Sequence, residues 1–195
     1  MLAALFFLTG LLSPYRENCP DSEAVETQDW QRLTYLAGCY LITPSLAHQV
    51  ARCGLMELIP EHVAAELGEI SHKVTLRNQR FHAQLAEIDA AFDAASLPYA
   101  VLKGGAYLVL PVYPTPSLRV MADLDFLVAE RDLERACRVL EGLDYEQLEA
   151  EDLDEKPTPH RHLSPFVSDR HIAAIELHRQ ALPAHLADCA PGAEL

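Results

Sequence analysis

The stretch VLKGGAYLVLPVYPTPSLRVMADLDFLV, residues 101–128, decides how this chain folds and where its chemistry is expected. Gly104 and Gly105 follow a short apolar run, and Asp123 and Asp125 lie two positions apart inside the next apolar run. Side chains alternate between the two faces of a strand, so both aspartates point the same way, with about 7 Å between them. The sequence therefore predicts two carboxylates on one face of a strand, preceded by a strand, a Gly-Gly turn and a helix.

Two carboxylates that face one pocket repel each other unless cations lie between them. Oxygen ligands on a rigid strand suit Mg²⁺, which binds through one or two carboxylates together with substrate phosphates. A Gly-Gly turn at the start of a helix lets a phosphate approach backbone N–H groups at the positive end of the helix dipole. Metal-dependent nucleotide chemistry is the prediction. The alternatives are a solvated acidic turn for the aspartates and an ordinary strand-to-helix turn for the glycines.

Three ordered motifs resemble those of a known group of proteins. They are Leu102-Lys103-Gly104, then Arg119 to Asp125 in the pattern RxxxDxD, then Glu176-Leu177-His178 in the pattern ExH. The chain is similar to nucleotidyltransferases of the DNA polymerase beta type, and most closely to the bacterial uncharacterised nucleotidyltransferase family, from about Trp30 to about Arg179. The resemblance implies an α+β fold, in which a helical N-terminal region accompanies a small mixed β-sheet nucleotidyltransferase core.

The resemblance also implies a role for each acidic motif residue. Asp123, Asp125 and Glu176 would be the catalytic carboxylates and would hold two Mg²⁺ ions that bridge the phosphates of a nucleoside triphosphate such as ATP. Glu176 would also accept the proton of the acceptor hydroxyl. It lies between Ile175 and Leu177, and burial of these neighbours would turn it to the opposite face of its strand. A surface glutamate on an edge strand is the alternative.

Four residues are expected to bind the nucleotide: Lys103, Gly104, Gly105 and Arg119. Lys103 would pair with the triphosphate or only solvate the end of its strand. Arg119 lies four residues ahead of Asp123, so it would contact phosphate or form a structural ion pair. His178, beside Glu176, would orient that carboxylate or touch the substrate.

Histidines around the end of the motif region offer a rival metal site. The four are His160, His162, His171 and His178. Neutral imidazoles can bind Zn²⁺, but no cysteine spacing and no HExxH pattern accompanies them. Exposed or hydrogen-bonded histidines are therefore the default expectation.

The composition limits the class of partner. A chain of 195 residues with 50% hydrophobic residues can bury a core in one large or two small domains. The formal net charge is −14, from 15 basic and 29 acidic residues. Nucleic-acid binders usually present a basic face, so no nucleic-acid partner is expected. A small-molecule or protein acceptor fits this charge better.

The cysteines and the N-terminus indicate a compartment. Five cysteines, an odd number without a CxxC pair, suggest a reduced cytoplasmic setting. Residues 1–12 are apolar, but they lack a basic start and are too short to span a bilayer. We expect them to form a helix that docks on the core, with a secretory signal as the minor alternative. No membrane partner is expected.

Hydrophobic spacing, proline and glycine predict the order of elements. After a polar connector at 13–28, helices are expected at 30–40, 45–53, 61–67 and 70–95. The α/β part follows, with strands at 98–102 and 120–128, helices at 104–110 and 131–140, an acidic loop at 149–155, and a hairpin of 161–167 with 172–177. The expected organisation is a helical region 1–96, a catalytic core 97–182 and a tail 183–195. Because the similar family continues into a further helical region, the chain is expected to be a fragment or a shortened member.

The predicted function is Mg²⁺-dependent transfer of an NMP group from an NTP to a hydroxyl of an unidentified small-molecule or protein acceptor, with release of pyrophosphate. The alternative is a noncatalytic nucleotide- or partner-binding protein that retains the nucleotidyltransferase fold.

Overall fold

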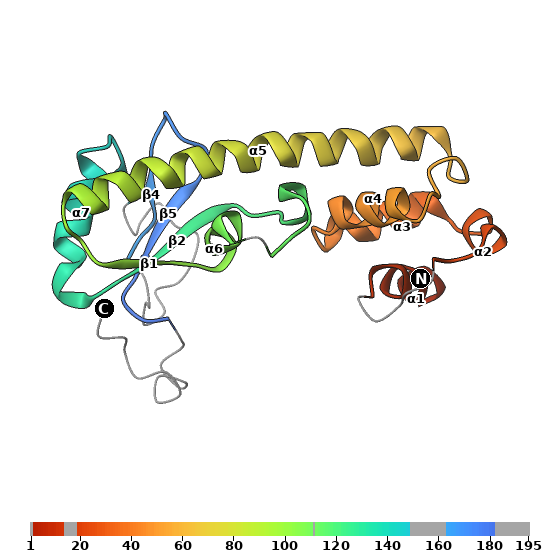
Figure 1. Cartoon of the computed structure of the whole chain (residues 1–195), viewed down its shortest axis with the longest axis horizontal. Helices are drawn as coiled ribbons and strands as arrows, with labels where there is room; N and C mark the ends of the chain where they lie inside the picture. Colours follow the sequence, from red (N-terminus) through yellow and green to blue (C-terminus); the bar gives the residue numbers. More distant parts are fainter. Residues whose placement is uncertain (1, 14–18, 111, 149–162, 182–195) are drawn as a thin grey trace. The chain divides into compact units, whose positions relative to one another are not determined.

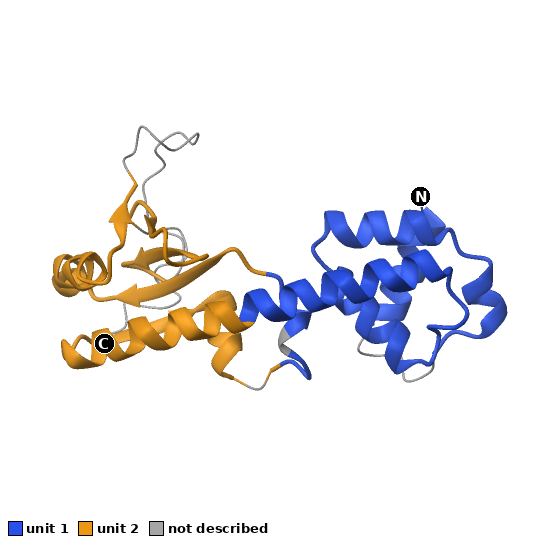
Figure 2. Ribbon diagram, turned by 90° about the horizontal axis from the view of Figure 1, so that it is seen from above, with its two compact units in different colours: residues 1–78, 113–120 blue, residues 79–112, 121–195 orange. Residues whose placement is uncertain are grey.

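The structure is a computed structural model that forms two compact units, which are described separately. It describes residues 2–13, 19–110, 112–148 and 163–181. One unit comprises residues 1–78 and 113–120, and the other comprises residues 79–112 and 121–195 (Figure 2). The predicted acidic loop at 149–155 and the predicted tail at 183–195 lie outside the described residues. The predicted division of the chain at residue 96 stays a prediction.

The first unit is a bundle of helices around a hydrophobic core. Its helices are α1 (Leu2–Leu12), α2 (Ser22–Glu26), α3 (Trp30–Cys39), α4 (Thr43–Arg52), the first part of α5 (Glu61–Ala94) and the short 3₁₀ helix η1 (Pro116–Leu118). Leu8, Leu33 and Leu46 lie together in its core. The buried indole of Trp30 donates a hydrogen bond to the carbonyl oxygen of Val25 at 3.1 Å. The prediction of an N-terminal helix docked on the core is confirmed, because α1 packs against α3 and α4.

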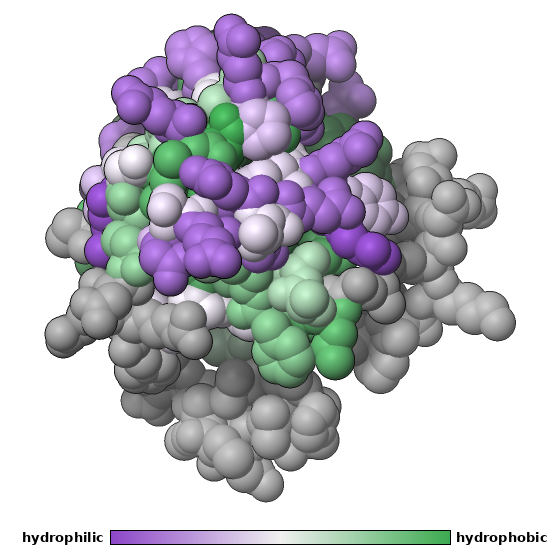
Figure 3. Space-filling view, turned by 90° about the vertical axis from the view of Figure 1, so that its right-hand side faces the viewer, coloured by the Kyte–Doolittle hydropathy of each residue, from purple (hydrophilic) through white to green (hydrophobic). Residues whose placement is uncertain are grey.

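Helix α1 also leaves apolar side chains in solvent. Leu2 and Phe6 are exposed, although Leu8 of the same helix is buried in the core. The face of the chain shown in Figure 3 is mostly hydrophilic, with hydrophobic side chains gathered below its middle and in a second group towards the upper left. No helix in the described part of the chain is long and apolar enough to cross a membrane.

The helices of this unit depart from the prediction in two main ways. Helix α2 lies inside the predicted polar connector, where Asp21 caps it by accepting a hydrogen bond from the Ala24 N–H at 2.7 Å. The two helices predicted on either side of Gly68 are one helix, α5. A glycine within a helix costs about 1 kcal/mol relative to alanine. Core contacts of Val63 and Leu67, which precede Gly68 at helical spacing, offset that cost.

The cysteines also correct an expectation. Cys19 and Cys53 form a disulfide with their Cα atoms 5.5 Å apart, so the prediction of reduced cysteines is wrong for this pair. The two residues are separated by 34 positions, and their proximity comes from the packing of the helical unit rather than from a local motif. Cys39 and Cys137 are free.

Within the described residues, the second unit contains a five-stranded mixed sheet with strand order β1-β2-β5-β4-β3. Strands β1, β2, β4 and β5 are labelled in Figure 1. The strands are β1 (Tyr99–Leu102), β2 (Asp123–Val128), β3 (Glu146–Gln147), β4 (Phe166–Val167) and β5 (Ala174–His178). The helices between them are α6 (Lys103–Val109), the 3₁₀ turn η2 (Glu130–Asp132) and α7 (Leu133–Glu141). Strand β2 pairs antiparallel with β1 and parallel with β5. The predicted α+β class is confirmed.

Most predicted elements of this unit are present, with shorter strands. Strand β2 begins at Asp123 rather than at residue 120. The predicted hairpin is confirmed as β4 and β5, which pair antiparallel at Phe166 and Ile175. Strand β3 was not predicted, because its two exposed residues carry no alternating apolar pattern.

The second half of α5 covers one face of the sheet. Four side chains at helical spacing form its buried stripe: Phe81, Leu85, Ile88 and Phe92. The sheet contributes the buried residues Leu124, Phe126, Val128, Ile175 and Leu177 to the same core. The Phe92 ring packs edge-on against Phe126, with centroids 5.6 Å apart. The alternation of these core residues along β2 and β5 leaves the other side chains of the two strands on the opposite face of the sheet.

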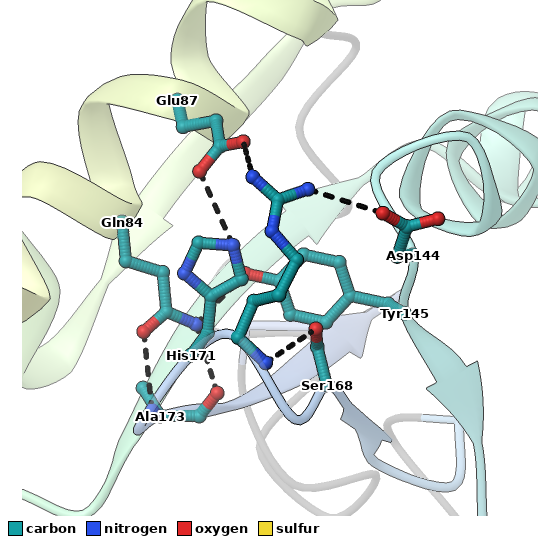
Figure 4. Close-up of polar contacts among 8 residues, drawn as sticks. Gln84, Glu87, Asp144, Tyr145, Ser168, His171 and Ala173 are labelled. Carbon is teal, nitrogen blue, oxygen red and sulfur yellow. Dashed lines mark hydrogen bonds and ion pairs between the residues drawn. The ribbon is translucent and has the colours of Figure 1, made fainter.

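Gln84 of α5 holds the start of β5 in place (Figure 4). Its Oε1 accepts from the Ala173 N–H at 3.1 Å, and its Nε2 donates to the Ala173 carbonyl at 2.8 Å and to the Tyr145 hydroxyl at 2.9 Å. Burial raises the pKa of Tyr145 to about 12, so this hydroxyl is neutral at physiological pH. His171 stacks on Tyr145 and lies 3.2 Å from a carboxylate oxygen of Glu87. These contacts fix the strand that carries the ExH motif.

Replacing Gln84 by alanine should lower the free energy of unfolding by about 2–4 kcal/mol, because the buried N–H and C=O of Ala173 would lose their partners. Gln147→Ala is the control, since this exposed side chain donates one bond to the Ser164 carbonyl at 3.3 Å. The control should change stability by less than about 0.5 kcal/mol. Urea denaturation followed by circular dichroism measures both, and equal effects would contradict this role of Gln84.

Candidate functional site

The register of three strands determines where the acidic residues lie. Asp125 of β2 is paired with Leu102 of β1 on one side and with Glu176 of β5 on the other. Ile175 and Leu177 are fully buried in the core beneath α5. Glu176 therefore lies on the opposite face of β5, as the alternation in the sequence predicted. Asp125 and Glu176 are neighbours on that face.

Four charged or ionisable side chains meet there, and we call them the Asp125 cluster: Lys103, Asp125, Glu176 and His178. The Lys103 ammonium donates to Asp125 Oδ1 at 2.5 Å, and His178 Nε2 lies 2.7 Å from the same oxygen. Glu176 Oε2 is 3.3 Å from His178 Nε2 and 3.8 Å from Lys103 Nζ. The Asp125 side chain is 1% exposed and that of His178 is 7% exposed, whereas that of Lys103 is 54% exposed. The cluster thus reaches solvent mainly through Lys103 and, to a smaller extent, through Glu176.

Burial and neighbouring groups shift the pKa in opposite directions at Asp125 and His178, and in the same direction at Asp123. Burial alone would raise the pKa of Asp125, but its hydrogen bonds with His178 and Lys103 outweigh burial and lower the pKa. Burial alone would lower the pKa of His178, but Asp125 and Glu176 outweigh it and raise the pKa. Burial raises the pKa of Asp123, and the negative charges of Asp125 and Glu176 raise it further. Asp125 is therefore held in its ionised form, whereas Asp123 is ionised at a cost.

Lys103 does more than solvate the end of its strand, since it pairs with Asp125 and Glu176 of the sheet, and its contact with a triphosphate stays a prediction. Its backbone has φ +47°, the left-handed region that residues other than glycine rarely adopt. Such a conformation costs about 1–2 kcal/mol. The ion pair with Asp125 opposes that cost at the turn between β1 and α6.

Gly104 and Gly105 have a steric reason to be glycine. A Cβ atom on Gly104 would lie 2.8 Å from Met121 Sδ, and one on Gly105 would lie 2.8 Å from Val101 Cγ1. Both glycines thus let α6 approach β1 and the residue that leads into β2. Packing accounts for them as an ordinary strand-to-helix turn, and contact with phosphate stays a prediction.

The remaining predicted site residues fall in different places. Asp123 lies two residues before Asp125 on β2 and interacts electrostatically with it. Arg119 belongs to the first unit, where its carbonyl oxygen accepts a hydrogen bond from Asn78 at 2.8 Å, and its phosphate contact stays a prediction. His160 and His162 lie outside the described residues, and His171 contacts Glu87 instead of His178.

His178 is more central than its sequence context suggested. The spacing of Glu176 and His178 repeats that of Asp123 and Asp125, so the same alternation rule places His178 beside Glu176 on one face of β5. That spacing was the available signal. The direct contact with Asp125 depends on the parallel register of β2 and β5, which the sequence does not specify.

The cluster has the donor atoms that a divalent cation needs. Asp125, Glu176 and His178 each offer one ligand atom, and these atoms lie within 4.8 Å of one another. Asp125 Oδ2 is buried and has no hydrogen-bond partner in the described part of the chain. A buried carboxylate oxygen normally has a partner. The residues present therefore fit a bound cation.

The architecture and the cluster define a mixed α+β protein with a polar site on the sheet face opposite α5. The chain belongs to the uncharacterised nucleotidyltransferase family, whose model matches residues 26–193 and so includes every residue of the Asp125 cluster. No curated protein and no solved structure matches the chain significantly.

The two aspartates of β2 should have opposite effects on stability. At pH 7, Asp123→Asn should raise the melting temperature, because it removes repulsion by Asp125 and Glu176. Asp125→Asn should lower the free energy of unfolding by about 1–3 kcal/mol, because Lys103 and His178 lose their anionic partner. Thermal denaturation of both variants beside the wild type measures the difference, and a shift of the same sign in both would contradict the assignment.

The pH dependence follows from the direction of each shift. The pKa of Asp123 is higher in the folded than in the unfolded state, so its penalty develops as pH rises and is absent below about 3.9. The gain from Asp123→Asn should therefore shrink as pH falls towards about 4. The pKa of Asp125 is lower when folded, so its contribution is present at neutral pH and is lost on acidification.

Proposed function

We propose that this protein is a Mg²⁺-dependent nucleotidyltransferase that moves an NMP group from an NTP, such as ATP, to a hydroxyl of a small-molecule or protein acceptor. The observation that carries this proposal is the pairing of a buried, ionised Asp125 with Glu176 on adjacent parallel strands. Membership of the uncharacterised nucleotidyltransferase family supports the class of reaction.

Asp123, Asp125 and Glu176 would hold two Mg²⁺ ions. When bound, such ions would neutralise the negative charge that develops on the phosphates during transfer. The partnerless Asp125 Oδ2 supports cation binding here, and ligand atoms of Asp125 and Glu176 lie within 4.8 Å of each other, in a group whose third member is His178 rather than Asp123. Asp123, with its raised pKa, would be relieved of repulsion by the same ions.

Glu176 is the residue proposed to handle the proton. The acceptor oxygen would form a bond to the α-phosphorus while the bond from that phosphorus to the β-phosphate bridging oxygen breaks, so pyrophosphate leaves. The hydroxyl proton would pass to the Glu176 carboxylate. This side chain is 18% exposed, whereas Asp125 is 1% exposed, so Glu176 is the more accessible of the two carboxylates.

Lys103, Gly104 and Gly105 complete the proposed nucleotide site, and a phosphate contact of Arg119 stays a separate prediction. In the structure, the Lys103 ammonium partly neutralises Asp125 and Glu176. A bound cation would take over this neutralisation, and the exposed lysine would then be free to pair with the triphosphate. The glycines, without Cβ atoms, would leave the backbone of this turn accessible to phosphate.

The acceptor and the compartment are proposed from charge and chemistry. A net charge of −14 disfavours a polynucleotide acceptor, which leaves a small molecule or a protein. We place the protein in the cytoplasm, where NTP and Mg²⁺ are available. The Cys19–Cys53 disulfide argues in the other direction, because such bonds are rare in reducing compartments.

Transfer should depend on the cluster while NTP binding depends on it less. The assay incubates each variant with Mg²⁺, labelled NTPs and host lysate, and measures the label transferred to an acceptor. Glu176→Gln should reduce this transfer by at least about a hundredfold, the scale expected for loss of a positioned proton acceptor. Its NTP affinity, measured by calorimetry, should be largely retained. Asp125→Asn should abolish transfer. Glu134→Gln, a change on the exposed surface of α7, should behave as wild type.

The NTP binding and transfer activity of the wild-type protein distinguish an enzyme from a noncatalytic binding protein. Glu176-dependent labelling of an acceptor supports the enzyme. NTP binding without transfer by any variant would favour the noncatalytic alternative. An absence of both binding and transfer would contradict the proposed nucleotide site.

A further inference from the structure

His178 adds a nitrogen ligand atom to the oxygen ligand atoms that the carboxylates of the Asp125 cluster offer to a metal ion. Its Nε2 atom lies 2.7 Å from Asp125 Oδ1 and 3.3 Å from Glu176 Oε2, and its ring is buried. It belongs to the group of three side chains whose ligand atoms lie within 4.8 Å of one another. A cation that bridges Asp125 and Glu176 would therefore have an imidazole nitrogen within reach.

The nitrogen changes which cation the group favours. Mg²⁺ prefers oxygen ligands in near-octahedral geometry and keeps several waters. Imidazole suits first-row transition metals, and carboxylates accept these ions as well. A set of two carboxylates and one imidazole thus includes a nitrogen ligand, which Mg²⁺ binds less readily than oxygen ligands. The buried Asp125 Oδ2, which lacks a hydrogen-bond partner in the described residues, is an independent sign that this set takes a ligand.

We propose that Asp125, Glu176 and His178 form a nitrogen-containing site for a divalent transition metal, with Mn²⁺ as its probe. The inference rests on the proposed function, since it assigns one of the two ions of that site. His178 ligates this ion through Nε2 and makes it bind more tightly than Mg²⁺. Asp123, which is outside the group of three, remains available for a Mg²⁺ ion that travels with the triphosphate.

The test is electron paramagnetic resonance of Mn²⁺ added to the full chain without nucleotide. Electron spin-echo modulation from a ¹⁴N nucleus reports a nitrogen bound to Mn²⁺. When the histidines carry ¹⁵N, modulation at ¹⁵N frequencies should replace the ¹⁴N modulation. A titration of free Mn²⁺, with Mg²⁺ as competitor, gives the two affinities. The wild type should bind Mn²⁺ at least about tenfold more tightly than Mg²⁺.

Two variants separate ligation from a general effect of histidine loss. His178→Gln should lose the nitrogen modulation and about tenfold in Mn²⁺ affinity, with a smaller change for Mg²⁺. His171→Gln is the matched control, because this histidine also contacts a carboxylate, that of Glu87, and lies outside the cluster. It should keep both the modulation and the affinity.

Several results would overturn the proposal. Bound Mn²⁺ without nitrogen modulation in the wild type would show that His178 only orients Asp125. If a folded His178→Gln protein binds Mn²⁺ as tightly as the wild type, this result would also show that His178 does not ligate the ion. If that variant does not fold, the ¹⁴N and ¹⁵N wild-type spectra still decide. No nucleotide is present, so failure of NMP transfer in the separate assay would leave this result standing.

Discussion

The site depends on how the chain satisfies one buried carboxylate. An ionised carboxylate removed from water is costly unless cations or hydrogen-bond donors surround it. Asp125 is 1% exposed and has Lys103 Nζ and His178 Nε2 within hydrogen-bond distance of one oxygen, while its other oxygen has no partner in the described part of the chain. This half-satisfied group is the strongest physical indication that the sheet face opposite α5 takes a cation.

The rest of the second unit supplies the partners of Asp125. The turn after β1 brings Lys103 to the carboxylate at the expense of a left-handed backbone, and the two glycines after it let α6 pack closely. The parallel pairing of β2 with β5 brings Glu176 and His178 alongside. Gln84 fixes the start of β5 to α5, so the packing of the core also determines the position of Glu176 and His178.

Local patterns in the sequence were enough to predict the face on which the acidic residues lie. Alternation placed Asp123 and Asp125 on one face of their strand and Glu176 opposite its buried neighbours, and apolar patterns with turn residues located β1, α6, α7 and the final hairpin. Contacts that depend on pairing between distant segments were not predictable in this way. The register that joins His178 to Asp125, the disulfide of Cys19 with Cys53, and the partner of Lys103 are all of this kind. The continuity of α5 through Gly68 was missed because packing overrides a local helix-breaking tendency.

Anomalous diffraction from crystals grown with Mn²⁺ and a nonhydrolysable NTP analogue tests the central claim, that Asp125 is a cation ligand. We expect a Mn²⁺ peak about 2.0–2.3 Å from an Asp125 carboxylate oxygen, with Lys103 Nζ moved from Asp125 towards the phosphates. Bound analogue with no peak at Asp125, and with the Lys103–Asp125 ion pair intact, would contradict it.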